Sequence, residues 1–201
     1  MQPLLSPSSS VTILGAGLLG SLLATSLARQ GHRVQVFEAG GPDGVGSAAY
    51  VAAAMVAPLA ESVVAEASIV RMGQHALARW PELIAPLPAP VYWQQNGTLI
   101  VWHRQDAADA SRLAGQLAAT RAQVPELPAM EPLSAARLAE VEPALAQRFA
   151  SGMLLPGEGQ LDNRQLLAAL ALEMQALGVR SHWHQAAEPA DFAPGASGQP
   201  D

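Results

Sequence analysis

A glycine-rich hexapeptide near the N-terminus constrains the fold of this chain more than any other feature. Gly15, Gly17 and Gly20 lie in the sequence Gly-Ala-Gly-Leu-Leu-Gly. The apolar residues 11–14 before it are typical of a buried parallel strand, and the leucine- and alanine-rich residues 18–30 after it predict a helix. GxGxxG between a strand and a helix is the fingerprint of a dinucleotide-binding βαβ unit. We therefore expect a Rossmann-like α/β fold.

Each of the three glycines has its own expected role in such a unit. Gly15 permits the tight turn, Gly17 lets the backbone approach a pyrophosphate, and Gly20 lets the helix pack closely on the strand. The free amides and the positive end of the helix dipole then face the diphosphate.

Glu38 is the expected ligand of the nucleotide ribose. Gly31 predicts the end of the first helix, and residues 33–37 predict a second strand that leads to this acid. A carboxylate at that strand end accepts hydrogen bonds from ribose hydroxyls and disfavours a 2′-phosphate. FAD and NAD share their ADP half, so this fingerprint leaves both open.

Residues 47–58 favour FAD over NAD. A simple NAD dehydrogenase is expected to continue into another β-α repeat, whereas this segment reads SAAYVAAAMVAP. Small side chains there would let backbone amides approach a large flat ring system such as a flavin. A tightly packed helix of small residues is the alternative reading.

The remaining sequence predicts an inserted α/β region and a return to the first sheet. We expect a helix at residues 61–80, an extended linker at 81–90, a hairpin of residues 91–95 and 99–103 about Asn96-Gly97, and helices at 106–121 and 134–142. Asp162 then predicts the N-cap of a helix that Gly178 ends, before a strand at residues 179–184. This returning helix and strand would extend the parallel sheet.

Composition excludes several classes of protein. The net charge is −6 and basic clusters are lacking, which argues against a nucleic-acid partner. No apolar run is long enough to cross a bilayer, and the first ten residues lack the pattern of a secretion signal. With no cysteine, disulfides and thiolate metal sites are excluded. We expect a cytoplasmic protein.

No metal site is expected. His182 and His184 would share one face of the last strand, but a third ligand is not evident. His75 and His103 have no acid or nucleophile nearby in sequence, so the catalytic residues remain unknown.

Several segments together resemble the FAD-dependent oxidoreductases of the D-amino-acid oxidase type, and most closely their glycine oxidase branch, which serves thiamin biosynthesis. The similar segments are GAGLLG with Glu38, AAAMVAP with Ala54 where glycine is usual, QNGTLIV, EVEPAL and LLPGEGQLDNRQLLAAL. The candidate cofactor-binding residues are Gly15, Ala16, Gly17, Leu18, Leu19, Gly20, Glu38, Ala53, Ala54 and Met55.

The resemblance implies a split Rossmann-like FAD-binding domain with an inserted mixed α/β substrate domain. Residues 1–10 would be a loose tail, residues 11–59 and 156–201 an incomplete FAD-binding domain, and residues 60–155 part of the substrate domain. The implied activity is oxidation of the amine carbon of glycine or another small amino acid to an imine. The substrate would therefore be a small amine or amino acid, and a homo-oligomer stays open.

The arginine that clamps the substrate carboxylate in such families would lie beyond Asp201, so the chain alone is expected to be inactive. Two alternatives stay open. One is a flavin-dependent amino-acid dehydrogenase that passes electrons to an acceptor other than oxygen, and the other is a non-catalytic nucleotide-binding fragment.

Overall fold

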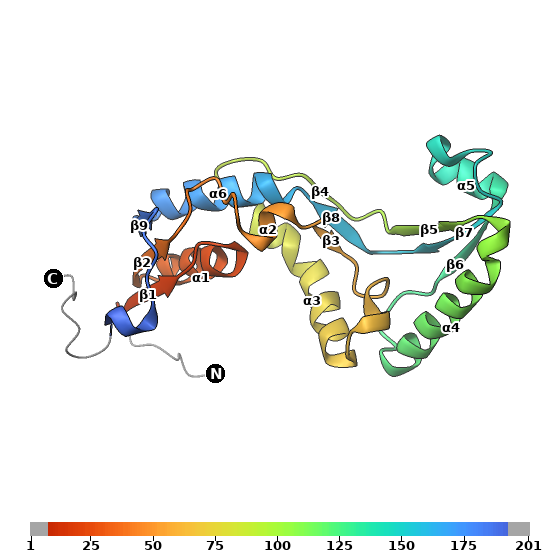
Figure 1. The fold of residues 1–201 in the computed structure, drawn as a ribbon, viewed down its shortest axis with the longest axis horizontal. Helices are drawn as coiled ribbons and strands as arrows, with labels where there is room; N and C mark the ends of the chain where they lie inside the picture. Colours follow the sequence, from red (N-terminus) through yellow and green to blue (C-terminus); the bar gives the residue numbers. More distant parts are fainter. Residues whose placement is uncertain (1–7, 193–201) are drawn as a thin grey trace. The chain divides into compact units, whose positions relative to one another are not determined.

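The computed structural model describes residues 8–192, and the chain divides into two compact units (Figure 1). The first unit comprises the N-terminal residues up to 54, residues 84–92 and residues 162 onward; the second comprises residues 55–83 and 93–161. Of the expected tail, residues 1–7 lie outside the described part, and Ser10 already belongs to the first strand. The assignment of the units to cofactor and substrate stays a prediction.

The first unit is a parallel three-stranded sheet with helices. Its elements are β1 (Ser10–Leu14), α1 (Leu18–Arg29), β2 (Arg33–Glu38), α2 (Ala48–Val51), α6 (Asn163–Ala176), β9 (Arg180–Trp183) and the 3-10 helix η4 (Pro189–Phe192). The strand order is β1-β2-β9, and both pairings are parallel. The predicted βαβ unit and the predicted return of a helix and a strand to the same sheet are therefore confirmed.

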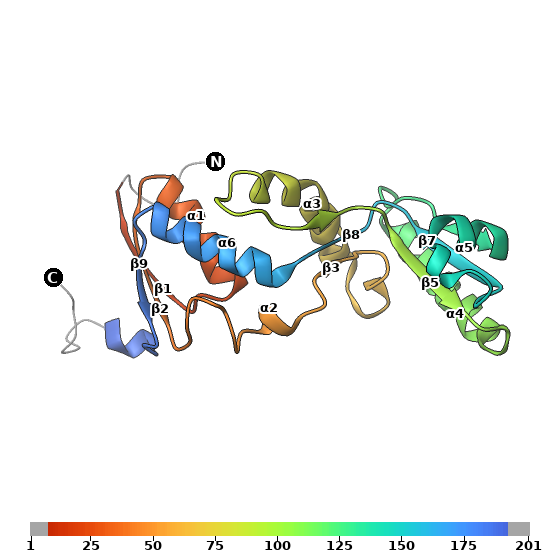
Figure 2. The same cartoon turned by 90° about the horizontal axis from the view of Figure 1, so that it is seen from above.

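Helices α1 and α6 lie on the same face of this sheet (Figure 2). Their small and apolar side chains pack against the β-branched residues of the strands to form the core, because a parallel sheet needs its apolar faces covered. The buried residues of this core are Ile13, Ala16, Ala24, Val34, Val36, Met174 and Val179. The two helices are also joined by Arg29, which donates from Nε and Nη2 to Oε1 of the nearly buried Glu173.

Both helices end and begin as the sequence predicts. Gly31 and Gly178 follow the two helices with φ of +86° and +71°, a left-handed conformation that costs glycine nothing. Asp162 caps α6 by accepting hydrogen bonds from the backbone N–H groups of Arg164 and Gln165.

The second unit contains two antiparallel sheets with helices. Its elements are β3 (Met55–Val56), α3 (Ala67–Ile84), β4 (Trp93–Gln94), β5 (Thr98–Trp102), α4 (Ala107–Gln123), β6 (Glu131–Ser134), α5 (Ala135–Val141), β7 (Ser151–Leu155) and β8 (Gly159–Leu161). Three 3-10 helices join them: η1 (Ser62–Val64), η2 (Arg104–Asp106) and η3 (Pro143–Leu145). The strand orders are β3-β8-β4 and β5-β7-β6. The inserted region therefore contains both strands and helices, as the sequence predicts.

The predicted hairpin about Asn96-Gly97 is wrong. β4 pairs with β8, and β5 pairs with β7, so the segment on each side of Asn96 is bonded to residues 151–161. Gly97 has φ of +94°, as a turn glycine would, but its N–H donates to the carbonyl of Glu158. The chain therefore continues as one extended segment along a distant partner instead of folding back on itself.

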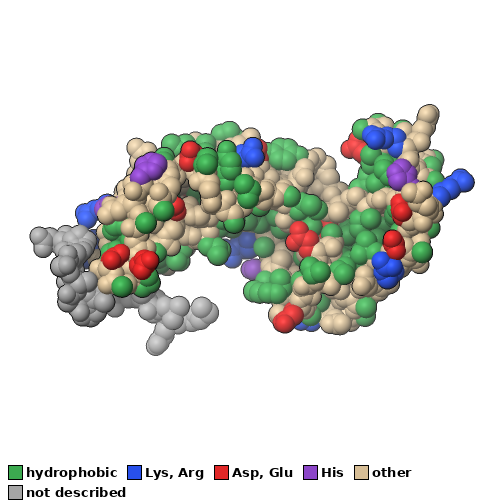
Figure 3. Space-filling model, viewed as in Figure 1, with side chains coloured by type: hydrophobic (Ala, Val, Ile, Leu, Met, Phe, Trp, Pro, Cys, Tyr) green, Lys and Arg blue, Asp and Glu red, His purple; other side chains and the backbone are tan. Residues whose placement is uncertain are grey.

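The predicted helix at residues 61–80 and the linker predicted after it lie at different positions in the structure. Residues 62–64 form η1, and α3 runs from Ala67 through Pro81 to Ile84. Within α3, Val70 and Leu77 are buried, whereas Ile69 and Met72 are exposed. Figure 3 shows hydrophobic side chains at the surface of the second unit, without distinguishing single residues.

Candidate functional site

The glycine-rich turn joins the ends of β1 and β2. Gly15 has φ of +96°, and its N–H donates to the carbonyl of Phe37 at 2.8 Å. This conformation is strained for a residue with a side chain, so glycine is required for the turn. The turn therefore brings the chain from the carboxyl end of β1 directly into α1.

Gly17 and Gly20 serve two different purposes in the turn. A Cβ at Gly20 would lie 1.9 Å from the carbonyl oxygen of Gly15, so only glycine allows this approach of helix and turn. A Cβ at Gly17 would meet no heavy atom within 4 Å, so the space beside it is open. Gly20 is thus needed by the fold, whereas Gly17 leaves room for a ligand against the backbone.

The N-terminus of α1 has the properties of an anion site. Gly17 is its N-cap, no side chain caps it, and its first turn carries no acidic residue. The amides of Leu18, Leu19 and Gly20 have no acceptor within the helix, because the first turn of any α-helix leaves its N–H groups unpaired. With the positive end of the dipole, these amides suit a diphosphate.

The side chain of Glu38 accepts hydrogen bonds from the glycine-rich turn and from its own loop, which sequence reasoning did not predict. Its Oε2 accepts a hydrogen bond from the N–H of Ala16 at 2.6 Å, and its Oε1 accepts one from the N–H of Gly40 at 2.8 Å. A carboxylate has about four lone-pair sites, so it can still accept hydrogen bonds from two ribose hydroxyls. The acid therefore both fixes the turn and is available to a nucleotide.

Ser21 is a supporting residue that sequence reasoning missed. It is 3% exposed, and its Oγ donates to the carbonyl of Ala16 at 2.8 Å. A polar residue on the buried face of an otherwise apolar helix is the signal that could have found it. Ser21 and Glu38 hold Ala16 from its two sides, through its carbonyl and its amide.

The small-residue segment reaches the boundary of the first unit. Ala53 and Ala54 are the last residues of the N-terminal part of that unit, and Met55 begins the second unit, where it pairs with Gln160. Ala54 has φ of +56°. A left-handed conformation at this position gives the physical reason why glycine would be usual there.

Replacing Ala54 with glycine is expected to stabilise the protein by about 1 kcal/mol, because the left-handed conformation costs an L-residue about 1–2 kcal/mol and glycine's greater freedom when unfolded offsets part of that gain. Chemical denaturation measures the difference. The matched control is Ala52→Gly at φ of −64°, where glycine has only its entropic cost and should destabilise. Equal effects of the two changes would contradict the strain at Ala54.

His182 and His184 do not share a strand face, contrary to the expectation from sequence. β9 ends at Trp183, and His184 has φ of +56°, so the strand alternation stops before it. The His182 ring stacks on Phe37 with ring centroids 4.2 Å apart. His182 therefore packs against the sheet as an aromatic side chain.

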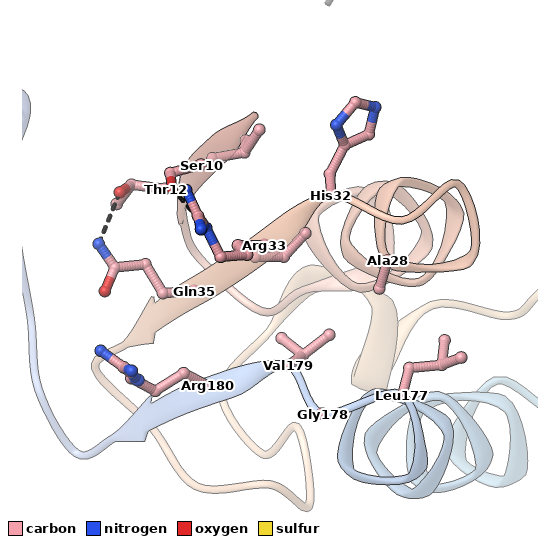
Figure 4. A pocket seen from close by; sticks show the side chains of 12 residues that line it. Ser10, Thr12, Ala28, His32, Arg33, Gln35, Leu177, Gly178, Val179 and Arg180 are labelled. Atoms are coloured by element: carbon pink, nitrogen blue, oxygen red, sulfur yellow. Dashed lines mark hydrogen bonds between the residues drawn. The ribbon is translucent and has the colours of Figure 1, made fainter. Parts of the chain in front are cut away.

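Two cavities of about 690 and 630 Å³ lie in the first unit away from the glycine-rich turn. The larger is at the amino ends of the strands, where Arg33 donates to Ser10 and Gln35 donates to Thr12 (Figure 4). Ligands of open parallel sheets bind outside the carboxyl ends of the strands. The open turn at Gly17 lies at the carboxyl end of β1 and therefore remains the predicted nucleotide site.

The family model described as FAD dependent oxidoreductase, of the DAO type, matches residues 10–196. The chain belongs to this family. A Rhizobium etli protein that carries the name thiamine biosynthesis oxidoreductase ThiO is 32% identical over 170 residues, which are 85% of this chain and 47% of that protein. The chain therefore spans about half the length of this relative.

Two solved structures have a similar fold over most of this chain. Glycine oxidase from Bacillus cereus ATCC 14579 is 19% identical with a TM-score of 0.72, over 88% of this chain and 46% of that one. Glycine oxidase from Geobacillus kaustophilus is 25% identical with a TM-score of 0.67, over 86% and 46%. These similarities confirm the mixed α/β fold with a parallel βαβ sheet.

Proposed function

We propose that this chain forms the FAD-binding part of an oxidoreductase that oxidises the amine carbon of glycine or another small amino acid to an imine. The observation that carries the proposal is the turn from Gly15 to Gly20, where an uncapped helix start faces open space beside Gly17. The membership of residues 10–196 in the family of FAD-dependent oxidoreductases supports FAD over NAD.

The residues of the first unit suit the ADP half of FAD. The first-turn amides of α1 would bind the pyrophosphate, and Glu38 would accept hydrogen bonds from the ribose hydroxyls. Ala53 and Ala54 would present small side chains to the isoalloxazine, and Met55 would present its backbone. FAD, when bound, supplies the acceptor for a hydride from the substrate.

The proposed substrate class is supported by the names of relatives. Two structures of this fold are glycine oxidases, and the Rhizobium relative is named for thiamine biosynthesis. A small amino acid oxidised in thiamin biosynthesis is therefore our proposal for the whole protein. Within residues 8–192, no helix is both long and apolar enough to span a bilayer.

The direct test uses protein made from the complete coding sequence. We expect a yellow preparation that releases FAD on denaturation and produces hydrogen peroxide with glycine or another small amino acid. Turnover with a quinone or dye but not with oxygen would favour the dehydrogenase alternative. A colourless protein that binds NAD would contradict the proposal.

Replacing Glu38 with alanine is expected to weaken binding of ADP and FAD by about ten- to a hundredfold, because charge-assisted hydrogen bonds contribute about 1.5–3 kcal/mol. Part of this loss would come from the turn, since Ala16 loses its acceptor. Calorimetric titration of the apoprotein measures both affinities.

Deoxynucleotides separate the ribose contact from the turn. If Glu38 binds the ribose, 2′-deoxy-ADP should bind wild-type protein more weakly than ADP, and the difference should vanish in Glu38→Ala. A difference that persists in the variant would show that another residue binds the hydroxyl.

A further inference from the structure

The short helix α2 is held by the first turn of α6. The side-chain amide of Asn163 donates to the backbone carbonyls of Ala49 and Ala52, the latter at 2.9 Å. The last carbonyls of a helix have no partner within it, so Asn163 supplies donors that the end of α2 lacks. The two N–H groups of a single side chain therefore fix both carbonyls.

Arg164 holds the same helix through a second contact. Its guanidinium lies 4.7 Å from the centroid of the Tyr50 ring, and its Nε donates to the carbonyl of Tyr50 at 3.4 Å. Such a cation–π contact is favourable and orients the planar guanidinium. Two adjacent residues of α6 thus contact α2 on its backbone and on its one aromatic side chain.

The helix α2 is not held in place by burial, and its N-cap Ser47, whose Oγ accepts a hydrogen bond from the N–H of Tyr50, fixes its start. It has four residues and none of them is buried. A single helical turn is not stable in water by itself, because nucleation is unfavourable. The contacts with Asn163 and Arg164 therefore determine where the chain leaves α2, at Ala52, and enters the strained residue Ala54.

We propose that Asn163, assisted by Arg164, is a positioning residue that orders residues 52–54 for the isoalloxazine half of FAD. This inference rests on the proposed function, which assigns the flavin to that segment. The ADP half is assigned to the turn from Gly15 to Gly20, which neither residue contacts through any bond in the described chain. Loss of the contacts should therefore weaken FAD and leave ADP unaffected.

The test is Asn163→Asp in apoprotein made from the complete coding sequence. Aspartate has the same shape, and at the start of α6 it is favoured by the helix dipole, so the helix itself should persist. Its carboxylate would face two carbonyl oxygens with no proton to donate. We expect FAD affinity to fall about tenfold, which corresponds to about 1.4 kcal/mol, and ADP affinity to stay at the wild-type value.

The control is Gln123→Glu, which likewise replaces a side-chain amide with a carboxylate, at an exposed residue of the second unit. It should leave both affinities unchanged. A second variant, Arg164→Leu, removes the contact with Tyr50 and should also weaken FAD selectively. It replaces the first variant if Asn163→Asp fails to fold.

The outcomes separate the inference from the proposed function. Wild-type apoprotein that binds neither ADP nor FAD would contradict the proposed function and the inference with it. Wild-type protein that binds FAD, with variants that bind it equally well, would contradict the inference alone. Equal losses of ADP and FAD affinity, or failure of both variants to fold, would show a merely structural role and overturn it.

Discussion

Replacing Gly20 with alanine is expected to destabilise the first unit by about 3 kcal/mol or more. The new Cβ would lie 1.9 Å from the carbonyl oxygen of Gly15 and 3.4 Å from a methyl group of Ile13. The first contact is with backbone, which cannot rotate away, so the cost should exceed the 1–3 kcal/mol typical of overpacking. Chemical denaturation followed by circular dichroism measures the change.

Gly17→Ala is the matched control, because a Cβ there meets no heavy atom within 4 Å. The stability of this variant should be close to that of the wild type. Its Cβ would instead occupy the space assigned to the pyrophosphate, so FAD and ADP affinities should fall sharply. Wild-type stability in Gly20→Ala would contradict the close approach of helix and turn, and wild-type ADP affinity in Gly17→Ala would contradict the pyrophosphate site.

A second large loss of stability is expected when Glu158 is replaced. This residue belongs to the second unit and is 2% exposed. Its Oε1 accepts hydrogen bonds from the backbone N–H groups of Leu59 and Ala60 at 2.8 and 2.9 Å. Glu158→Ala would leave both amides without an acceptor and create a cavity beside Leu59. At about 1–3 kcal/mol for each amide left without an acceptor, we expect a loss of about 2–6 kcal/mol in the free energy of unfolding.

Glu158→Gln tests whether the free energy of unfolding depends on the acceptor atom of Glu158 or on its charge. The glutamine Oε1 can accept the same two hydrogen bonds, so most of the stability should return. The Oε2 of Glu158 is buried and has no hydrogen-bond partner among the described residues, so loss of the charge at that atom costs little. Glu140→Ala, in an exposed pair with Arg137, is the surface control and should change stability by less than about 0.5 kcal/mol. An equal loss in all three variants would contradict the role of the two amides.

The sequence predicted the elements whose geometry is local. The roles of Gly15, Gly17 and Gly20 follow from backbone conformation and from the spacing of strand and helix, which neighbouring residues determine. The cap at Asp162 and the helix end at Gly178 are local for the same reason. The return of a helix and a strand to the parallel sheet followed from a pattern that repeats the first βαβ unit, whereas the structure placed β9 beside β2.

The prediction from sequence was wrong where the hydrogen-bonding partner of a segment lies far along the chain. Asn96-Gly97 is a favourable turn sequence, but residues 151–161 supply a longer antiparallel partner for both of its flanks. Local turn preference contributes little against the hydrogen bonds of a full ladder. The linker was expected to begin at Pro81, but α3 continues through this residue to Ile84.

By itself, the sequence determined the family, the α/β fold and the glycine turn of the candidate site, because these depend on short segments with fixed spacing. Only the tertiary structure placed Glu38 on the amide of Ala16, Glu158 on the amides of Leu59 and Ala60, and Asn163 at the end of α2. Each of these side chains satisfies backbone groups 22 or more residues away. Such partners are chosen by the packing of whole elements, which no local pattern of residues encodes.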